Sequence, residues 1–144
     1  MTDTLTPHER SERMSQIRGK DSSSEMRLRR LIHSMGFRYR LHVKTLPGTP
    51  DLVFSAKRAV IFMHGCFWHR HQNCRLSRMP KSRVHYWHEK FEANRRRDNA
   101  NISRLNELGW RVLVIWECQI KAKNLNEVSN LVKRFLGDGT TRLG

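Results

Sequence analysis

Three histidines and two cysteines lie within eleven residues of the chain, in the stretch HGCFWHRHQNC at positions 64–74. Thiolate sulfurs and imidazole nitrogens are the usual ligands of structural zinc, which four such ligands surround as a tetrahedron. Cys66, His71 and Cys74 are close enough for one loop to wrap an ion, and Cys118 is the third cysteine. We therefore predict a closed zinc site of three cysteines and one histidine. The alternative for Cys118 is an ordinary small buried side chain.

The spacing does not decide which of the three histidines binds zinc. His64 and His69 are candidates for a catalytic base, because imidazole changes its charge near neutral pH, or for a zinc ligand or phosphate contact. Asp51 opens an apolar run after a proline, where a carboxylate is either a turn residue or a ligand of Mg²⁺. Glu25 stands three residues after Ser22, so a capping-box role competes with an active-site role.

The charge of the chain favours a nucleic-acid partner. Its 144 residues include 28 Lys and Arg against 13 Asp and Glu, a formal net charge of +15. Such an excess attracts polyanions over long range, although a merely soluble basic protein is the alternative. A basic nuclease would use Mg²⁺ to neutralise a phosphate oxygen and position an attacking water. The longest apolar run, at 59–63, is too short to span a bilayer, and the N-terminus lacks the apolar core of a signal peptide. An odd cysteine count without such a signal favours the cytoplasm.

The elements that must position these residues follow from apolar periodicity. We predict helices at 23–35, 82–108 and 124–136, strands at 37–43 and 110–118, and a hairpin from the runs at 51–55 and 59–63. This order predicts an α/β domain over 21–144, with a small mixed sheet flanked by helices, preceded by a polar arm at 1–20. The strand at 110–118 is the most apolar and the best candidate for a central one. If it lies parallel to 59–63, Cys118 arrives beside the loop that begins at His64.

Aromatic side chains lie beside the cysteines and on the long helix. Phe67 and Trp68 are adjacent, and exposed aromatics on a basic protein stack on bases or wedge between them. The alternative is that both rings fill a small core under the loop. Trp87, Lys90 and Asn94 share one helix face. That face either points to a ligand or is part of an ordinary charged surface.

The stretches LPGTPDLVF, AVIFMHGCFWHRH, RRD and ISRLNELGWRVLVIWEC resemble the very short patch repair (Vsr) mismatch endonucleases. The likeness extends from about Arg10 to Phe135. It implies a restriction-endonuclease-like core related to the PD-(D/E)XK group, one structural zinc, and nicking of DNA beside a T·G mismatch left by deamination of 5-methylcytosine. It also implies double-stranded DNA as the partner, a functional link to a cytosine-5 methyltransferase and to other repair proteins, a monomer, and a cytoplasmic, nucleoid-associated location.

The resemblance assigns roles to individual positions. It implies that zinc is bound by Cys66, His71, Cys74 and Cys118. It implies that Mg²⁺ is bound by Asp51 and the main-chain carbonyl of Met63, with His69 as the base and Glu25 and His64 assisting. It implies that DNA is contacted by Phe67, Trp68 and Trp87 in the major groove, by Met14 and Ile17 of the arm, and by Lys90 and Asn94 at the mispair.

The sequence departs from some members of this family at two places. Position 63 is Met where some members have Thr, which does not matter if only its carbonyl is used. Gln72 and Asn73 make the loop before Cys74 one residue longer than in some members.

Two other functions are alternatives to this one. One alternative function is a nuclease of the same core that cuts matched DNA. The other is a zinc-stabilised DNA-binding module without activity, in which Asp51 and His69 would be dispensable.

Overall fold

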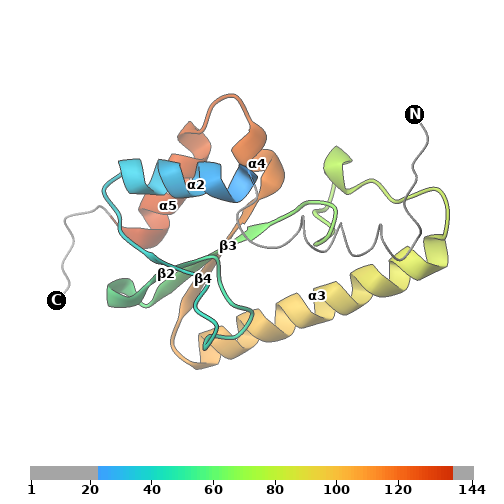
Figure 1. The fold of residues 1–144 in the computed structure, drawn as a ribbon, viewed down its shortest axis with the longest axis horizontal. Helices are drawn as coiled ribbons and strands as arrows, with labels where there is room; N and C mark the ends of the chain where they lie inside the picture. Colours follow the sequence, from blue (N-terminus) through green and yellow to red (C-terminus); the bar gives the residue numbers. More distant parts are fainter. Residues whose placement is uncertain (1–22, 138–144) are drawn as a thin grey trace.

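A four-stranded mixed sheet forms the centre of the computed structural model, which describes residues 23–137 (Figure 1). The strands lie in the order β1 (Arg40–Leu41), β2 (Leu52–Phe54), β3 (Ala59–His64) and β4 (Arg111–Trp116). β2 runs antiparallel to β1 and β3, whereas β3 and β4 are parallel. The predicted arm at 1–20, with Met14 and Ile17, lies outside the described residues.

Helices cover both faces of this sheet, as the sequence predicts. The helices are α2 (Ser23–Ser34), α3 (Val84–Glu107), α4 (Glu117–Lys121) and α5 (Asn126–Leu136). In Figure 1, α2, α4 and α5 lie on one side of the sheet and the long α3 on the other. The prediction of a small mixed sheet flanked by helices is therefore confirmed. No helix among residues 23–137 combines the length and apolar character needed to cross a lipid bilayer.

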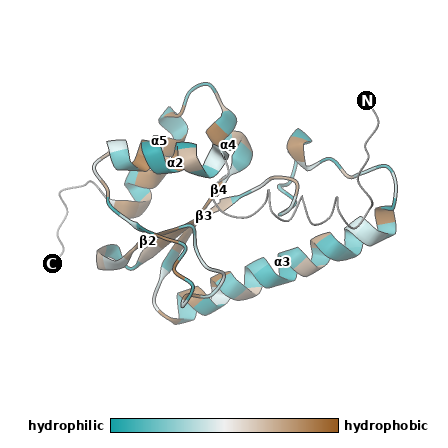
Figure 2. Ribbon diagram, in the orientation of Figure 1, coloured by the Kyte–Doolittle hydropathy of each residue, from teal (hydrophilic) through white to brown (hydrophobic). Residues whose placement is uncertain are grey.

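The period of two along β3 explains how one strand serves two cores. Ala59 and Ile61 pack with the core under α2, α4 and α5, whereas Val60 and Phe62 pack with the core that contains Leu105 of α3. Figure 2 shows the strands in the apolar colour and most of α3 in the polar colour. Because α3 is mostly solvated, only a narrow stripe of it holds the helix on the sheet.

Three element predictions are wrong in detail. The strand predicted at 37–43 is reduced to two exposed residues, because the backbone turns at His42, whose φ is 46°. β4 is an edge strand of the described sheet rather than a central one. The strand is apolar because helices cover both of its faces. The apolar pattern does not show whether a strand has a hydrogen-bonded neighbour on one side or on both. The strand also ends at Trp116, so Cys118 lies on α4.

Candidate active site and metal centre

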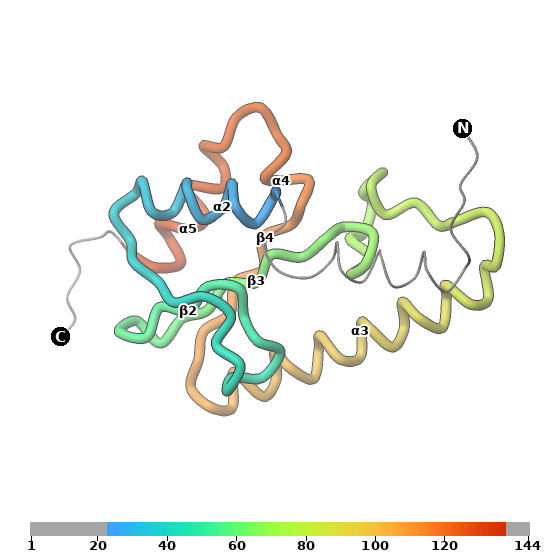
Figure 3. The backbone as a smooth tube through the Cα atoms, in the orientation of Figure 1, coloured from blue at the N-terminus to red at the C-terminus, as the bar shows by residue number. Residues whose placement is uncertain are grey.

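The parallel pair of strands brings candidate metal ligands from two distant segments to the same end of the sheet. His64 is in register with Trp116, so β3 and β4 end side by side. The chain that leaves β3 runs beside the first half of α3 (Figure 3), and the chain that leaves β4 turns at once into α4. As expected for parallel strands, Cys118 therefore meets the loop after His64, and its backbone N–H donates to the sulfur of Cys66 over 3.4 Å.

The three cysteines and His71 form a cluster with the dimensions of a zinc site. Their ligand atoms all lie within 4.8 Å of one another. His71 Nδ1 is 3.6 Å from the sulfur of Cys66 and 3.4 Å from that of Cys118. Ligands at zinc–sulfur and zinc–nitrogen distances on a tetrahedron are separated by about 3.5 Å. The residues present therefore fit a bound zinc ion.

Several contacts hold His71 toward the cysteines. Its ring stacks on Trp116 with centroids 4.2 Å apart, and its backbone N–H donates to the carbonyl of Cys66 over 3.0 Å. Its carbonyl accepts a hydrogen bond of 2.6 Å from the hydroxyl of Ser77. The longer loop before Cys74 is accommodated by Asn73, whose φ of 55° is a left-handed conformation that Asn tolerates. Of the three histidines among which spacing did not decide, His71 is the one that lies with the cysteines.

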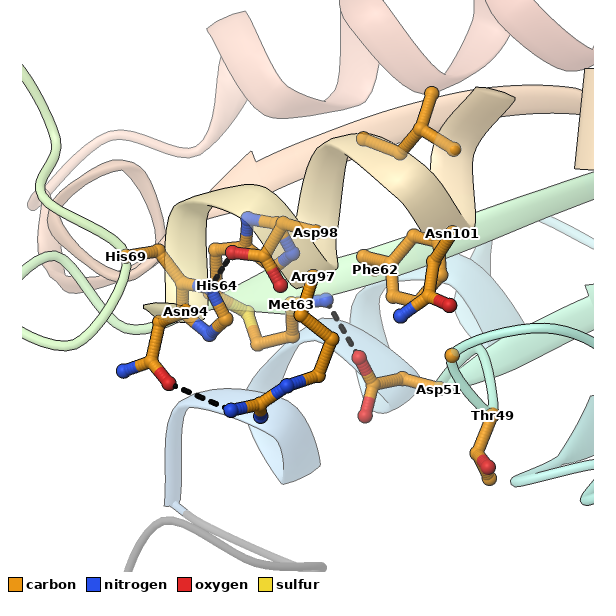
Figure 4. Close-up of a pocket in the computed structure, with 12 residues that line it drawn as sticks. Thr49, Asp51, Phe62, Met63, His64, His69, Asn94, Arg97, Asp98 and Asn101 are labelled. Carbon is orange, nitrogen blue, oxygen red and sulfur yellow. Dashed lines mark hydrogen bonds and ion pairs between the residues drawn. The ribbon is translucent and has the colours of Figure 1, made fainter. Parts of the chain in front are cut away.

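The other two histidines form a second group with a residue of α3. His64 and His69 stack in parallel with ring centroids 3.8 Å apart, and His69 Nδ1 pairs with Oδ2 of Asp98 (Figure 4). Burial, with a smaller contribution from the neighbouring His69, lowers the pKa of His64 to about 3, although Asp98 opposes the shift. His64 is therefore neutral at physiological pH, so it can lie against His69 without charge repulsion. Asp98 fixes the His69 ring so that its Nε2 edge is turned away from the carboxylate.

Two carboxylates meet at the start of β2. Oδ2 of Asp51 accepts the backbone N–H of Met63 over 2.7 Å. Burial raises the pKa of Asp51 to about 7, and the nearby Glu25 carboxyl raises it too, although the hydrogen bond from Met63 opposes them. Glu25 is 2% exposed and pairs with Arg29 one turn along α2. The capping-box alternative for Glu25 involves Ser22, which lies outside the described residues.

This carboxylate pair has the chemistry of a divalent-cation site. Burial raises the pKa of Asp51, with a smaller contribution from Glu25, and a hard cation bound there would favour the ionised carboxylate. The N–H and C=O of one residue in a strand point toward the same neighbouring strand. The carbonyl of Met63 therefore faces the side on which its N–H meets Asp51. At this position no residue of β2 pairs with β3. The residues present fit Mg²⁺.

Asp51 of the carboxylate pair and the group of His64, His69 and Asp98 line one cavity of about 360 Å³. Asp51 and Met63 line one side, and His69 and Asp98 line another, with Arg97 between them (Figure 4). Arg97 donates to Oδ1 of Asn94 over 3.0 Å. A space this size, with a carboxylate on one wall and an oriented imidazole on the other, can hold a phosphate and a water between them.

The aromatic residues pack against one another rather than standing apart. Phe67 makes edge contacts with Trp68, Trp87 and Phe91, at centroid distances of 5.2, 5.6 and 5.1 Å. Asn94 is 3% exposed, and its Nδ2 donates to the carbonyl of Trp68 over 3.3 Å. This packing agrees with the small-core alternative. Phe67, Trp68 and Trp87 nevertheless keep part of their surface exposed, and Lys90 lies on the same helix.

Sequence reasoning missed His42 and Asp98 as site residues. Asp98 had a usable signal, because Asn94, Asp98 and Ile102 repeat every four residues and so share the face that continues the apolar line. The charged run that contains Asp98 obscured it. His42 had none, because it was assigned to a regular strand. Its Nε2 lies 2.8 Å from Oε2 of Glu25 and 3.6 Å from Oδ1 of Asp51.

Comparison with known proteins gives consistent matches. The family model described as DNA mismatch endonuclease Vsr matches residues 2–76. A type II nicking enzyme of Xanthomonas oryzae pv. oryzae is 52% identical over 120 residues, which cover 83% of this chain and 88% of that protein. The DNA mismatch endonuclease Vsr of Escherichia coli is 44% identical over 123 residues, covering 85% and 78%. A type II nicking enzyme of Neisseria meningitidis serogroup A is 41% identical over 123 residues, covering 85% and 87%.

Proposed function

Because the chain belongs to the Vsr family of DNA mismatch endonucleases, we propose that this DNA-nicking enzyme acts on one strand beside a T·G mismatch left by deamination of 5-methylcytosine. The observation that carries this proposal is the cavity in which Asp51 and the oriented His69 face a common space. The net charge of +15 supports attraction to the DNA backbone. Initiation of very short patch repair is the corresponding role in the cell.

Two metals complete the proposal. Mg²⁺ would be held by Asp51 and the carbonyl of Met63, where it would neutralise charge on the scissile phosphate. Zinc would be held by Cys66, His71, Cys74 and Cys118, where it would keep the loop after β3 in place. We further propose that the sheet and helices form a restriction-endonuclease-like core of the PD-(D/E)XK type.

His69 is the proposed base in the hydrolysis. With Nδ1 occupied by Asp98, the lone pair of Nε2 is available to take a proton from the attacking water. The water oxygen forms a bond to phosphorus as the bond to the 3′-oxygen breaks. The leaving oxygen takes up a proton from solvent, giving a 5′-phosphate and a 3′-hydroxyl. His64 supports the His69 ring by stacking, and Glu25 supports Asp51.

The aromatic residues are proposed to recognise the distorted duplex. Phe67, Trp68 and Trp87 would enter the major groove, and Met14 and Ile17 of the arm would contribute contacts from the other side. Unstacking a base step costs a few kcal/mol, and a T·G wobble is less stable than a matched pair. Wedging is therefore easier at the mispair. Lys90 and Asn94 are the proposed contacts to its bases, which for Asn94 requires exchange of its bond to Trp68.

The remaining expectations concern the cellular setting. Action at deaminated 5-methylcytosine implies a functional link to a cytosine-5 methyltransferase and to proteins that complete the repair. We propose that the enzyme works as a monomer in the cytoplasm, associated with the nucleoid.

A nicking assay tests the proposed substrate. End-labelled duplexes with a single T·G, T·A or C·G pair in otherwise identical sequence are incubated with Mg²⁺ or EDTA. We expect a nick in the T-containing strand of the T·G duplex only, and only with Mg²⁺. Equal cutting of the C·G duplex would indicate a nuclease for matched DNA. Binding without a nick in any duplex would indicate a DNA-binding module.

The proposed role of His69 as a base predicts that substitution of its partner Asp98 slows nicking. Asp98→Asn removes the charge that orients the imidazole, and we expect the single-turnover nicking rate to fall about 100-fold, the lower end of a general base's contribution. DNA affinity, measured by fluorescence anisotropy, should stay near the wild-type value. Glu89→Gln is the control, because Glu89 lies on the same helix with its side chain 71% exposed. A wild-type rate for the Asp98 variant would contradict this role.

A further inference from the structure

We propose that His42 is a positioning residue that fixes the carboxylates of Glu25 and Asp51 relative to each other, and so sets the affinity of the site for a divalent cation. This inference rests on the proposed function of Asp51 as a cation ligand. The two acids come from different elements, since Glu25 lies on α2 and Asp51 immediately precedes β2. Their carboxyls also contact each other directly, and His42, which follows β1, contacts both of them.

The side chain of His42 lies against both carboxylates. Its Nε2 is 2.8 Å from Oε2 of Glu25 and 3.6 Å from Oδ1 of Asp51. The side chains are 12% exposed for His42 and 3% for Glu25, so water competes little for these contacts. Arg29 pairs with the same Glu25 oxygen from within α2. Arg29 therefore pairs Glu25 with its own helix, whereas His42 lies against both Glu25 and Asp51.

The backbone of His42 is held in an unfavourable conformation at the same place. Its φ of 46° is in the left-handed region, which costs energy for a residue with a β-carbon. Its N–H donates to the carbonyl of Asp51 over 3.3 Å, one step beyond the pairing of Leu41 with Leu52. Strained conformations persist where the surrounding contacts over-determine them, often at functional sites. Here the strain ends the short strand β1 and directs the imidazole toward Glu25.

A cation ligand depends on the groups that orient it. Oδ2 of Asp51 is engaged by Met63, so Oδ1 is the oxygen nearest His42. Mutating an outer-shell residue that orients the ligands of a metal site typically costs about 10- to 100-fold in metal affinity. We therefore expect His42→Ala to weaken cation binding about tenfold while leaving all proposed ligands in place.

The experiment measures cation binding separately from nicking. Mn²⁺, which replaces Mg²⁺ as a paramagnetic probe, is titrated into the zinc-loaded protein, and the free ion is followed by electron paramagnetic resonance. His42→Ala should raise the dissociation constant about tenfold. His42→Gln, whose amide N–H can reach a carboxylate, should recover most of the affinity. His33→Ala is the matched control, because His33 is exposed on α2 and its substitution should change nothing.

Nicking of the T·G duplex as a function of Mg²⁺ supplies the second readout. The Mg²⁺ concentration for half-maximal rate should rise in His42→Ala by the same factor, with zinc content and the melting temperature measured in parallel. A folded His42→Ala protein with the Mn²⁺ affinity of His33→Ala would overturn the inference. So would a slower rate with an unchanged Mg²⁺ midpoint. Failure of the proposed function looks different: Asp51→Asn would then bind Mn²⁺ as tightly as the wild type.

Discussion

Asp51→Asn is expected to abolish nicking of the T·G duplex, lowering the rate by about 1,000-fold or more. The cation that Asp51 is proposed to hold supplies several kcal/mol of transition-state stabilisation, and each 1.4 kcal/mol is about a factor of ten in rate. The amide keeps the shape of the side chain and can still accept the N–H of Met63. The loss is therefore expected in the chemical step, measured by single-turnover nicking with saturating enzyme.

The same substitution should not weaken the fold. Burial raises the pKa of Asp51, so ionising this group is harder in the folded than in the unfolded state. Above the ordinary pKa of a carboxyl, this difference lowers the free energy of unfolding, and the neutral amide removes that cost. The melting temperature at neutral pH should equal or exceed that of the wild type. Zinc content and DNA affinity should be unchanged.

Glu107→Gln is the matched control for this test, because Glu107 is an exposed carboxylate at the end of α3. It should nick at the wild-type rate. Nicking by Asp51→Asn within about tenfold of the control would mean that the carboxylate is not the essential cation ligand, since a factor of ten is only about 1.4 kcal/mol.

His71→Ala should cost the protein its zinc and a large part of its stability. We expect about one zinc per chain in wild-type protein purified without added metal, and almost none in the variant. A structural zinc site contributes directly to the free energy of folding. A loss of about 3 kcal/mol would lower the melting temperature by about 10 °C in a domain of this size.

Nicking should be lost as well, because the loop that the proposed zinc would hold also carries His69 and Phe67. His88→Ala is the matched control, since His88 is exposed on α3. It should retain zinc, melting temperature and activity. Metal analysis by mass spectrometry and thermal melting provide the measurements. A His71→Ala protein that keeps one zinc per chain would contradict the assignment of this ligand, and zinc-free wild type would contradict the site.

Local patterns were enough to predict most helices and strands, and one long-range contact followed once a parallel pairing was assumed. The apolar periodicity placed α2, α3 and α5 within two residues of their observed bounds. Cys118 was expected beside the loop after His64 on the condition that the runs at 59–63 and 110–118 lie parallel, and the two strands are parallel. This succeeded because periodicity follows from which faces are buried, and parallel strands must end on the same side of a sheet.

The sequence by itself thus determined the charge, the fold class, the helices, and the set of residue types able to bind metal and act on a phosphate. Only the tertiary structure decided which histidine lies with the cysteines, that Asp98 orients His69, and that His42 connects Glu25 to Asp51. The reason is that these contacts join side chains far apart in the sequence: Glu25 and His42 are 17 residues apart, and His69 and Asp98 are 29 apart. The distances between them are set by the paths of the loops and by the left-handed turn at His42. No local period encodes such a path.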